Sequence, residues 1–495
     1  MTDLTDYKQV ALEGATIINA NCIEVMASMP SDSVDAIVCD PPYGLEFMGK
    51  DWDKLTVQGG AGFSEDGMGK GFAALPSFKG SPNPSCRNCG GTQRGNDGQG
   101  VKRCHCDNPV FPNRGLEQSI AQQAWHLLWV QEALRVLKPG GHLLAFGGTR
   151  TYHRLAVAIE DAGFEIRDCL SWMYGSGFPK SMDVSKAIDK AAGATREVVG
   201  RKTGRAATPV RDIRGGGLID NRPNDFDASA ITAPATDEAE QWDGWGTALK
   251  PSWEPIIMAR KPFRGTVANN VLEHGTGAIN IAATRISHAS EADLATSLAK
   301  NPGRTDTVTS GVYGSNRPQQ SVNTDGRWPA NSLLSHDDEC GDECVEGCPI
   351  AMLDAQSGPR GAAAPASGPT WDGSWTSDSM AGEFKGTDAP SKFHADKGGA
   401  SRFFYCAKTP KKERNAGLPD GKKNDHPTVK PVNVMRWLVK MVTPPGGTVL
   451  DPFMGSGSTG IAALEEGFTF VGIDLESAYC NIAYHRLTHT IEKHA

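Results

Sequence analysis

The 495-residue sequence lacks several features that would assign it to other classes of protein. No apolar run reaches the roughly 20 residues of a membrane-spanning helix, and the first residues, MTDLTDYKQV, are too polar for a signal peptide. The net charge of −8 argues against a general nucleic-acid coat but does not exclude a local basic groove. We therefore expect a soluble cytoplasmic protein without membrane contacts.

Two regions of the chain alternate between strand and helix patterns. Strands are predicted at 34–39, 142–146, 164–173, 448–450 and 468–473, and helices at 118–137, 152–162, 432–442, 458–466 and 477–489. Such alternation is typical of a parallel sheet covered by helices on both faces. The C-terminal region alone has too few strands, so we predict one sheet divided between the two ends of the chain.

The stretch Gly455-Ser-Gly-Ser-Thr-Gly460 has the spacing of a dinucleotide-binding loop. It lies between a strand pattern and a helix pattern, and an acid, Asp474, follows about one β-α unit later. An NAD-dependent oxidoreductase would fit this loop. That assignment gives no role to a second motif, Asp40-Pro-Pro-Tyr43, which follows the strand predicted at 34–39.

The second motif combines a carboxylate, carbonyl groups and an aromatic ring. The two prolines donate no ladder hydrogen bond, so they direct the chain out of the sheet at its carboxyl edge, where ligands of open α/β sheets bind. An amine on a planar base has two N–H donors, which Asp40 and the carbonyl of Pro41 can accept, and a face on which Tyr43 can stack. The set suits an amine that attacks an electrophile. Taken alone, the motif also fits a plain strand-ending turn.

Together the two motifs resemble those of DNA amino-methyltransferases. Asp40-Pro-Pro-Tyr43 is similar to the catalytic motif of that family, and Asp451-Pro-Phe-Met-Gly-Ser-Gly-Ser-Thr459 to its S-adenosylmethionine loop. The order of the motifs is similar to the β class of site-specific enzymes, phage-type members included. The resemblance implies an α/β, Rossmann-like methyltransferase fold with a mixed sheet, a circularly permuted motif order and Gly/Cys-rich insertions.

The resemblance also implies ligands and partners. The cofactor is expected to be S-adenosylmethionine, and the substrate double-stranded DNA with the target base flipped out. Homodimers are common in the family, and a cognate restriction nuclease is a possible partner. An Asp at the first motif position goes more often with adenine N6, and Ser with cytosine N4. We therefore predict methyl transfer to adenine N6, with cytosine N4 as the alternative.

Two other assignments are less favoured. An RNA or protein-amide N-methyltransferase would usually have Asn at the first motif position. A DNA-binding protein that has lost catalysis would not need both motifs intact.

On this basis the chain divides into five parts. Residues 1–50 form the catalytic-motif half of the methyltransferase domain, 51–115 an insertion with a candidate zinc knuckle, 116–190 a continuation of the sheet, 191–400 a variable target-recognition region with a second candidate zinc site, and 401–495 the cofactor-binding half. The long middle region is rich in Gly, Ser, Thr, Pro and Asp, with islands of order at 253–258, 277–286 and 328–334.

The candidate site residues follow from the motifs. The catalytic candidates are Asp40, Pro41, Pro42 and Tyr43, and the cofactor candidates are Asp451, Phe453, Gly455, Gly457, Asp474, Thr428 and Lys430. The glycines allow close backbone approach, Asp451 can accept from the ammonium, and Asp474 from the ribose hydroxyls. The segment 426–431 resembles the family's approach to the methionine end. A core position for Phe453 and an ordinary helix start for Thr428 and Lys430 remain alternatives.

Seven of the twelve cysteines fall into two clusters. The first is Cys86, Cys89, Cys104 and Cys106, two close pairs with the spacing of a four-thiolate zinc knuckle. The second is His336, Cys340, Cys344 and Cys348, spaced every four residues. A continuous helix would separate its ends by about 18 Å, but the glycines of the segment favour a loop that could hold one ion. We predict structural zinc at both, with free surface thiols as the alternative for the first cluster.

Overall fold

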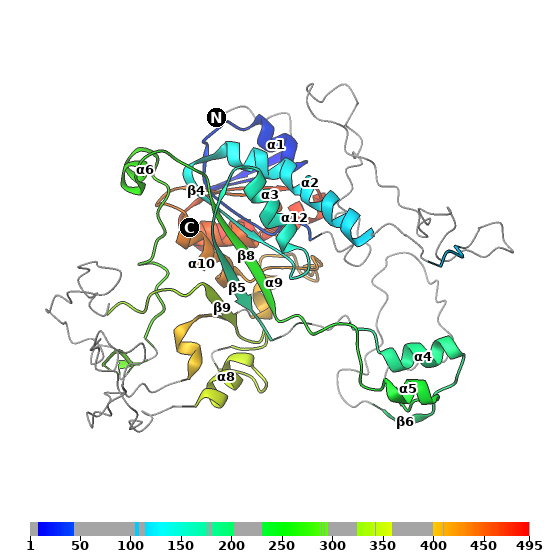
Figure 1. Cartoon of the computed structure of the whole chain (residues 1–495). Helices are drawn as coiled ribbons and strands as arrows, with labels where there is room; N and C mark the ends of the chain where they lie inside the picture. Colours follow the sequence, from blue (N-terminus) through cyan, green and yellow to red (C-terminus); the bar gives the residue numbers. More distant parts are fainter. Residues whose placement is uncertain are drawn as a thin grey trace, which may run out of the picture. The chain divides into compact units, whose positions relative to one another are not determined.

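The structure is a computed structural model of the chain, and it describes residues 8–43, 104–107, 114–175, 177, 181–201, 230–288, 290–291, 293–295, 324–341, 343–358, 399–408 and 410–494. The chain divides into two compact units, one of Met1–Gly175 with Trp253–Ala495 and one of Ser176–Ser252. Figure 1 shows the elements of each unit along the chain.

The larger unit contains a ten-stranded sheet in the order β1-β2-β12-β11-β3-β4-β8-β5-β9-β10. Its strands are β1 (Gln9–Leu12), β2 (Ala15–Asn19), β3 (Val34–Cys39), β4 (Leu137–Phe146), β5 (Glu165–Met173), β8 (Trp253–Arg260), β9 (Ser332–Ser335), β10 (Tyr405–Ala407), β11 (Thr448–Asp451) and β12 (Thr469–Asp474). Only β1 and β8 run antiparallel to their neighbours. The mixed, mostly parallel sheet confirms the predicted α/β fold class.

The two ends of the chain meet in the middle of this sheet. β11 pairs in parallel with β3, with Val449 opposite Ala36 and Leu450 opposite Ile37. All six residues of β3 are buried, as expected for a strand covered on both faces. The buried carboxylate of Asp35 reinforces the junction, because its Oδ2 accepts from the backbone N–H of Thr448 at 2.8 Å. The predicted division of one sheet between the chain ends is therefore confirmed.

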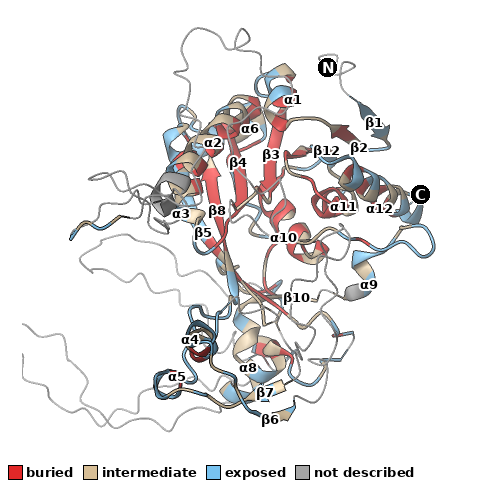
Figure 2. Ribbon diagram, turned by 90° about the vertical axis from the view of Figure 1, so that its right-hand side faces the viewer, coloured by how far each residue is buried: buried red, intermediate tan, exposed pale blue. Residues whose placement is uncertain are grey.

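Helices cover both faces of the sheet. The helices α1 (Cys22–Ser28), α2 (Arg114–Val136) and α3 (Tyr152–Asp161) share one apolar core with alternate residues of the central strands. On the other face lie α10 (Val432–Val442), α11 (Ser458–Glu465) and α12 (Ser477–His494), around a second core. Figure 2 shows the buried strands β3, β4 and β8 between the helices of these two groups. The result is a three-layer α/β/α arrangement.

Two strands differ from the predictions. β4 begins at Leu137 and not at residue 142 as predicted, so it includes the Pro139-Gly-Gly141 segment. β8, predicted as an isolated island of order, lies inside the sheet between β4 and β5. Its Pro255 has no N–H to donate, and the opposite residue, Ser171, donates to Asn331 instead.

Shorter helices complete the larger unit: α6 (Val267–His274), α8 (Pro349–Ser357), the 3₁₀ helix η5 (Ala400–Phe403) and α9 (Lys411–Arg414). Among the described residues, none of the helices combines the length and the apolar character that crossing a membrane requires.

The smaller unit has α4 (Val184–Ala192), β6 (Val198–Arg201), β7 (Ala230–Thr232) and α5 (Asp237–Gln241). A buried ion pair organises it: Arg196 Nη1 lies 2.6 Å from Asp189 Oδ2, and the hydroxyl of Thr236 donates to Asp189 Oδ1. Arg196 is one of the basic residues of the variable region, and here it has a structural partner.

Candidate functional site

The Asp40-Pro-Pro-Tyr43 motif follows the last residue of β3, at the carboxyl edge of the parallel strands. β11, the neighbour of β3, ends at Asp451 on the same edge, so the cofactor loop predicted at 451–459 also begins there. Parallel neighbours place their carboxyl ends side by side. The structure thus brings together the two motifs that lie about four hundred positions apart in the sequence.

Asp40 forms an ion pair with a buried lysine. The ammonium of Lys430 lies 2.6 Å from Asp40 Oδ2 and 3.2 Å from Glu254 Oε2, and the lysine side chain is 8% exposed. Burial alone would lower the pKa of Lys430, but the two carboxylates raise it above its ordinary value. Burial raises the pKa of Asp40, whereas Lys430 acts in the opposite direction. One cation therefore stabilises two largely buried carboxylates, 18% and 19% exposed.

The second oxygen of Asp40 has a different environment. Asp40 Oδ1 is buried and accepts no hydrogen bond from the residues that the structure describes. A buried acceptor without a donor is costly and is usually explained by function. The carboxylate is thus anchored through Oδ2 and offers Oδ1 to a ligand at the edge of the sheet.

Tyr43 is held by hydrogen bonds at its side-chain hydroxyl and at its backbone carbonyl. Its hydroxyl donates to Glu254 Oε2 at 3.0 Å, and its carbonyl accepts from Gln122 Nε2 of α2 at 2.8 Å. Gly148 packs so close to the ring that a Cβ there would lie 3.0 Å from Tyr43 Cδ2. These contacts hold the ring at the strand edge without using its hydroxyl for a ligand.

Aromatic rings surround the ammonium of Lys430. Its Nζ lies 5.6 Å from the ring centre of Tyr43, 4.9 Å from that of Phe146 and 5.9 Å from that of Trp172. Tyr174 adds a hydrogen bond from its hydroxyl to Glu254 Oε1 at 3.3 Å. Such rings attract a cation through their negative faces. The site is a polar pair enclosed by an aromatic wall.

The predicted cofactor loop has the backbone that its glycines allow. Gly455 has φ +52° and Gly457 has φ +81°, both in the left-handed region. A Cβ at Gly455 would lie 2.7 Å from His426 Nε2, and one at Gly457 would lie 3.0 Å from Ala483 Cβ. Both glycines are therefore required by their conformation and by the space around them.

Asp451 and Asp474 stabilise this loop. Asp451 is 2% exposed, and its two oxygens accept from the N–H of Phe453 and, at 2.5 Å, from the hydroxyl of Thr459. Asp474 accepts from the N–H groups of Gly455 and Glu476, both at 2.8 Å. Burial raises the pKa of Asp451 to about 7 and that of Asp474 to about 6, although these hydrogen bonds act in the opposite direction.

The remaining cofactor candidates, Phe453, Thr428 and Lys430, do not all lie at the cofactor loop. Phe453 is partly buried against Trp125 and Trp129, with ring centres 5.9 and 5.1 Å away, in agreement with the core alternative. Thr428 donates its N–H to His426 Nδ1 at 3.3 Å, beside the loop. Lys430 instead lies at the catalytic motif. The predicted contacts of all these residues with the cofactor stay predictions.

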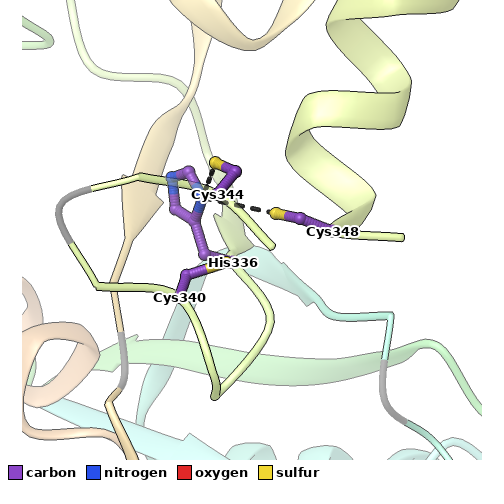
Figure 3. Close-up of side chains that lie close together, drawn as sticks. All are labelled: His336, Cys340, Cys344 and Cys348. Carbon is purple, nitrogen blue, oxygen red and sulfur yellow. Dashed lines mark hydrogen bonds between the residues drawn. The ribbon is translucent and has the colours of Figure 1, made fainter. Parts of the chain in front are cut away.

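The second cysteine cluster is brought together by the structure. His336, Cys340, Cys344 and Cys348 lie on the segment between β9 and α8, and their ligand atoms are all within 4.8 Å of one another. Figure 3 shows the four side chains converging. In the first cluster, Cys104 and Cys106 are partly exposed. Cys86 and Cys89 lie outside the described residues.

Sequence reasoning missed Glu254 and Gln122. Glu254 lies in β8, between Trp253 and Pro255, and no motif or spacing marks it. Gln122 lies on the polar side of a helix pattern and reaches Tyr43 only through folding. The pairing of Lys430 with Asp40 joins positions 390 apart, so it could not be read from local sequence.

Comparisons with known proteins agree with this geometry. The chain matches the N6/N4 DNA methylase family over residues 34–485. Type II methyltransferase M.HindIII of Haemophilus influenzae is 25% identical over 267 residues, which are 53% of this chain and 64% of that protein. Type II methyltransferase M2.DpnII of Streptococcus pneumoniae is 45% identical over 62 residues, 12% of this chain and 23% of that protein.

Among solved structures, the M1.HpyAVI–SAM complex is 13% identical, with coverage of 96% of this chain and 98% of that chain at a TM-score of 0.34. The matches span less than two thirds of the length of both curated relatives. The family match, in contrast, includes both motifs and the strands that carry them. This chain therefore belongs to the N6/N4 DNA methylase family.

Proposed function

We propose that the protein transfers a methyl group from S-adenosylmethionine to the N6 amine of adenine in double-stranded DNA, with the target base flipped out of the helix. The observation that carries the proposal is the environment of Asp40. One of its oxygens is held by Lys430, and the other is buried and accepts no hydrogen bond from the described residues.

The amine of a flipped base supplies the missing donors. One N–H of the amine donates to Asp40 Oδ1, and the other donates to the carbonyl of Pro41, the next residue of the motif. Both bonds localise the nitrogen lone pair and direct it outward from the ring. Because the site is buried, these interactions act in a low dielectric and need no reorganisation during the reaction. Lys430 favours the ionised form of Asp40, which is the form that accepts.

Tyr43 positions the base. Its ring stacks on the flipped base, and stacking of this kind contributes about 1–3 kcal/mol. The hydrogen bonds to Glu254 and from Gln122 fix the ring before the base arrives. Catalysis then relies on orientation more than on proton transfer. As the amine nitrogen forms its new N–C bond, the methyl–sulfur bond would break with its electron pair remaining on sulfur. The nitrogen then loses one proton, and Asp40 Oδ1 is the acceptor in place.

The cofactor loop fits S-adenosylmethionine. The left-handed backbone at Gly455 and Gly457 sets the course of the loop, and Asp474 at the tip of β12 is only partly buried. We assign the ribose hydroxyls to Asp474 and the methionine end to the segment around Thr428. Both acids accept two hydrogen bonds within the chain, but Asp451 is only 2% exposed whereas Asp474 is partly exposed, so we assign Asp451 to holding the loop. When bound, S-adenosylmethionine supplies an electrophilic methyl group at this edge.

Cytosine N4 is the second candidate, since its amine presents the same two N–H donors to Asp40. We favour adenine because an Asp at the first motif position goes more often with adenine in this family.

Expression in a host without adenine or cytosine-N4 methylation, followed by modification-sensitive sequencing of its DNA, tests the proposal. The expected result is N6-methyladenine at one short sequence motif, absent with Asp40→Ala. N4-methylcytosine would select the second candidate, and unmodified DNA from soluble, cofactor-binding protein would refute both.

A further inference from the structure

The loop between β9 and α8 gathers one imidazole and three thiols. In sequence, His336, Cys340, Cys344 and Cys348 recur every four residues, a spacing that a straight helix would spread over about 18 Å. In the structure the chain turns back, with Gly347 at φ +81°, and the four ligand atoms lie within 4.8 Å of one another. The side chains converge from both sides of the loop (Figure 3).

We propose that this cluster is a structural zinc site, with His336 Nδ1 and the three cysteine sulfurs as its four ligands. Tetrahedral zinc with Zn–N and Zn–S bonds of about 2.05 and 2.3 Å places nitrogen and sulfur about 3.5 Å apart. His336 Nδ1 lies 3.3 Å from Cys344 Sγ and 3.5 Å from Cys348 Sγ. These separations agree with a shared ion.

The surroundings of the cluster also favour a metal. Cys340 is 1% exposed and Cys348 is 0% exposed, and the N–H of Val345 donates to Cys340 Sγ at 3.4 Å. Buried sulfurs that receive such bonds are well suited to be thiolates, which require a cation beside them. Three sulfurs with one imidazole select a soft ion such as zinc over calcium or magnesium.

The site would fasten an edge of the sheet. The N–H of His336 donates to the carbonyl of Ala407 in β10 at 3.0 Å, and Lys408 Nζ donates to the carbonyl of Gly341 at 2.9 Å. In the described part of the chain, the apolar cluster around the loop has four buried residues, two of which are the ligands Cys340 and Cys348. So small a core leaves most of the loop's stability to the ion.

The site also adjoins the aromatic rings that surround Lys430. Ser335, the residue before His336, accepts a buried hydrogen bond from Trp172 Nε1 at 2.8 Å. The ring of Trp172 in turn lies 5.9 Å from Lys430 Nζ. In this proposal zinc takes no part in the reaction. It holds the end of β9, where Ser335 contacts Trp172.

Metal analysis of the full-length protein tests the proposal. Cys344→Ser removes an exposed ligand, and Cys169→Ser is the matched control, since Cys169 is also an exposed thiol of the larger unit. After dialysis against a weak chelator, Cys344→Ser is expected to hold one zinc ion per chain fewer than the wild type, and Cys169→Ser the same number as the wild type. Measuring the difference keeps the result independent of the cluster at 86–106. Equal zinc content in all three proteins would overturn the proposal.

A second measurement covers the case in which Cys344→Ser does not fold. A variant with Cys86→Ser and Cys89→Ser, which disables the first cluster, is grown with cobalt and is expected to show the intense visible bands of a tetrahedral ion and thiolate-to-metal charge transfer, both lost when a mercurial reagent titrates the thiols. A disulfide within 340–348, detected by mass under non-reducing conditions, or six-coordinate cobalt spectra would overturn the proposal.

Discussion

Replacement of Lys430 by Met removes the only described cation that contacts both Asp40 and Glu254. Methionine preserves the length and most of the volume of the side chain, so the aromatic wall keeps its packing. The two carboxylates are then buried without a counter-charge. We therefore expect a large loss of stability together with a loss of activity.

The magnitude follows from the burial of the pair. Removing one partner of a buried ion pair costs about 3–5 kcal/mol, because the other charge stays in a low dielectric. Here two carboxylates lose their partner, which places Lys430→Met in the upper part of that range. The tyrosine hydroxyls that donate to Glu254 lessen the penalty for that residue. Urea unfolding followed by tryptophan fluorescence measures the change.

Two further variants isolate the electrostatic cause. Lys440→Met breaks a Lys–Glu pair in which the lysine is 31% exposed, and should cost only about 0–1 kcal/mol. Adding Glu254→Gln to Lys430→Met removes one of the stranded charges while the amide oxygen still accepts from Tyr43. The free energy of unfolding of the double variant should therefore be about 2 kcal/mol higher than that of Lys430→Met alone. A recovery of this sign is expected when the two charges interact directly.

The pH profile of Lys430→Met adds a second readout. Lys430 lowers the pKa of Asp40, so its removal raises that pKa further and favours the protonated form, which cannot accept the amine proton. Methyl transfer should fall at least 100-fold at pH 7 and recover partly as the pH rises. A variant with wild-type stability and an unshifted profile would refute the role given to this ion pair.

Three further predictions concern the loop and the ring. Because burial raises the pKa of Asp451 from 3.8 to about 7, the stability it contributes is complete below pH 4 and lost as the pH rises through 7. The stability of Asp451→Asn relative to wild type should thus increase by about 2–3 kcal/mol between pH 5 and pH 8 in urea unfolding, and a constant difference would contradict this. Gly455→Ala should weaken cofactor binding at least 10-fold in calorimetry. The control, Gly467→Ala, also has a positive φ of +74° but has nothing within 4 Å of its Cβ, so it should bind the cofactor normally. Equal losses of cofactor affinity in the two variants would contradict the steric argument. Tyr43→Phe should keep activity within about 10-fold and Tyr43→Ala should lose 100-fold or more, since stacking needs the ring and not the hydroxyl; similar losses in a methyl-transfer assay would count against stacking.

The sequence predicted the parts of the fold that local patterns encode. Strands β3 and β11 were predicted from short apolar runs, and their position at one edge followed from the motifs at their carboxyl ends. The pairing of Ala36 with Val449 confirms the division of the sheet. The hydrophobic pattern and the motif spacing suffice to predict these strands, because both depend on a few consecutive residues.

The site could be predicted only in part. β8 has Pro255 near its middle, which argues against a central strand, and only the pairing of Ser171 with Asn331 resolves that conflict. Glu254 reaches Tyr43 because β8 enters the sheet between β4 and β5. Contacts of this kind depend on strand order, which a single sequence does not encode locally.

The contact of Lys430 with Asp40 could not be predicted from the sequence either. The resemblance directed its segment toward the methionine end of the cofactor. The structure places its ammonium on Asp40 instead, because Pro431 ends the loop and starts α10 beside β3 and β4. Ion-pair partners across a buried site are set by packing.

The central claim is that Asp40 Oδ1 receives the amine of a flipped base at the edge shared with the cofactor loop. Nucleoside mass spectrometry after incubation of DNA with methyl-labelled S-adenosylmethionine tests it most directly, with wild type compared with Asp40→Asn. We predict labelled N6-methyl-2′-deoxyadenosine from the wild type and at least a 1,000-fold smaller yield from Asp40→Asn, with cofactor affinity unchanged. Equal labelling by both proteins, or label only outside amino groups of the bases, would contradict the account.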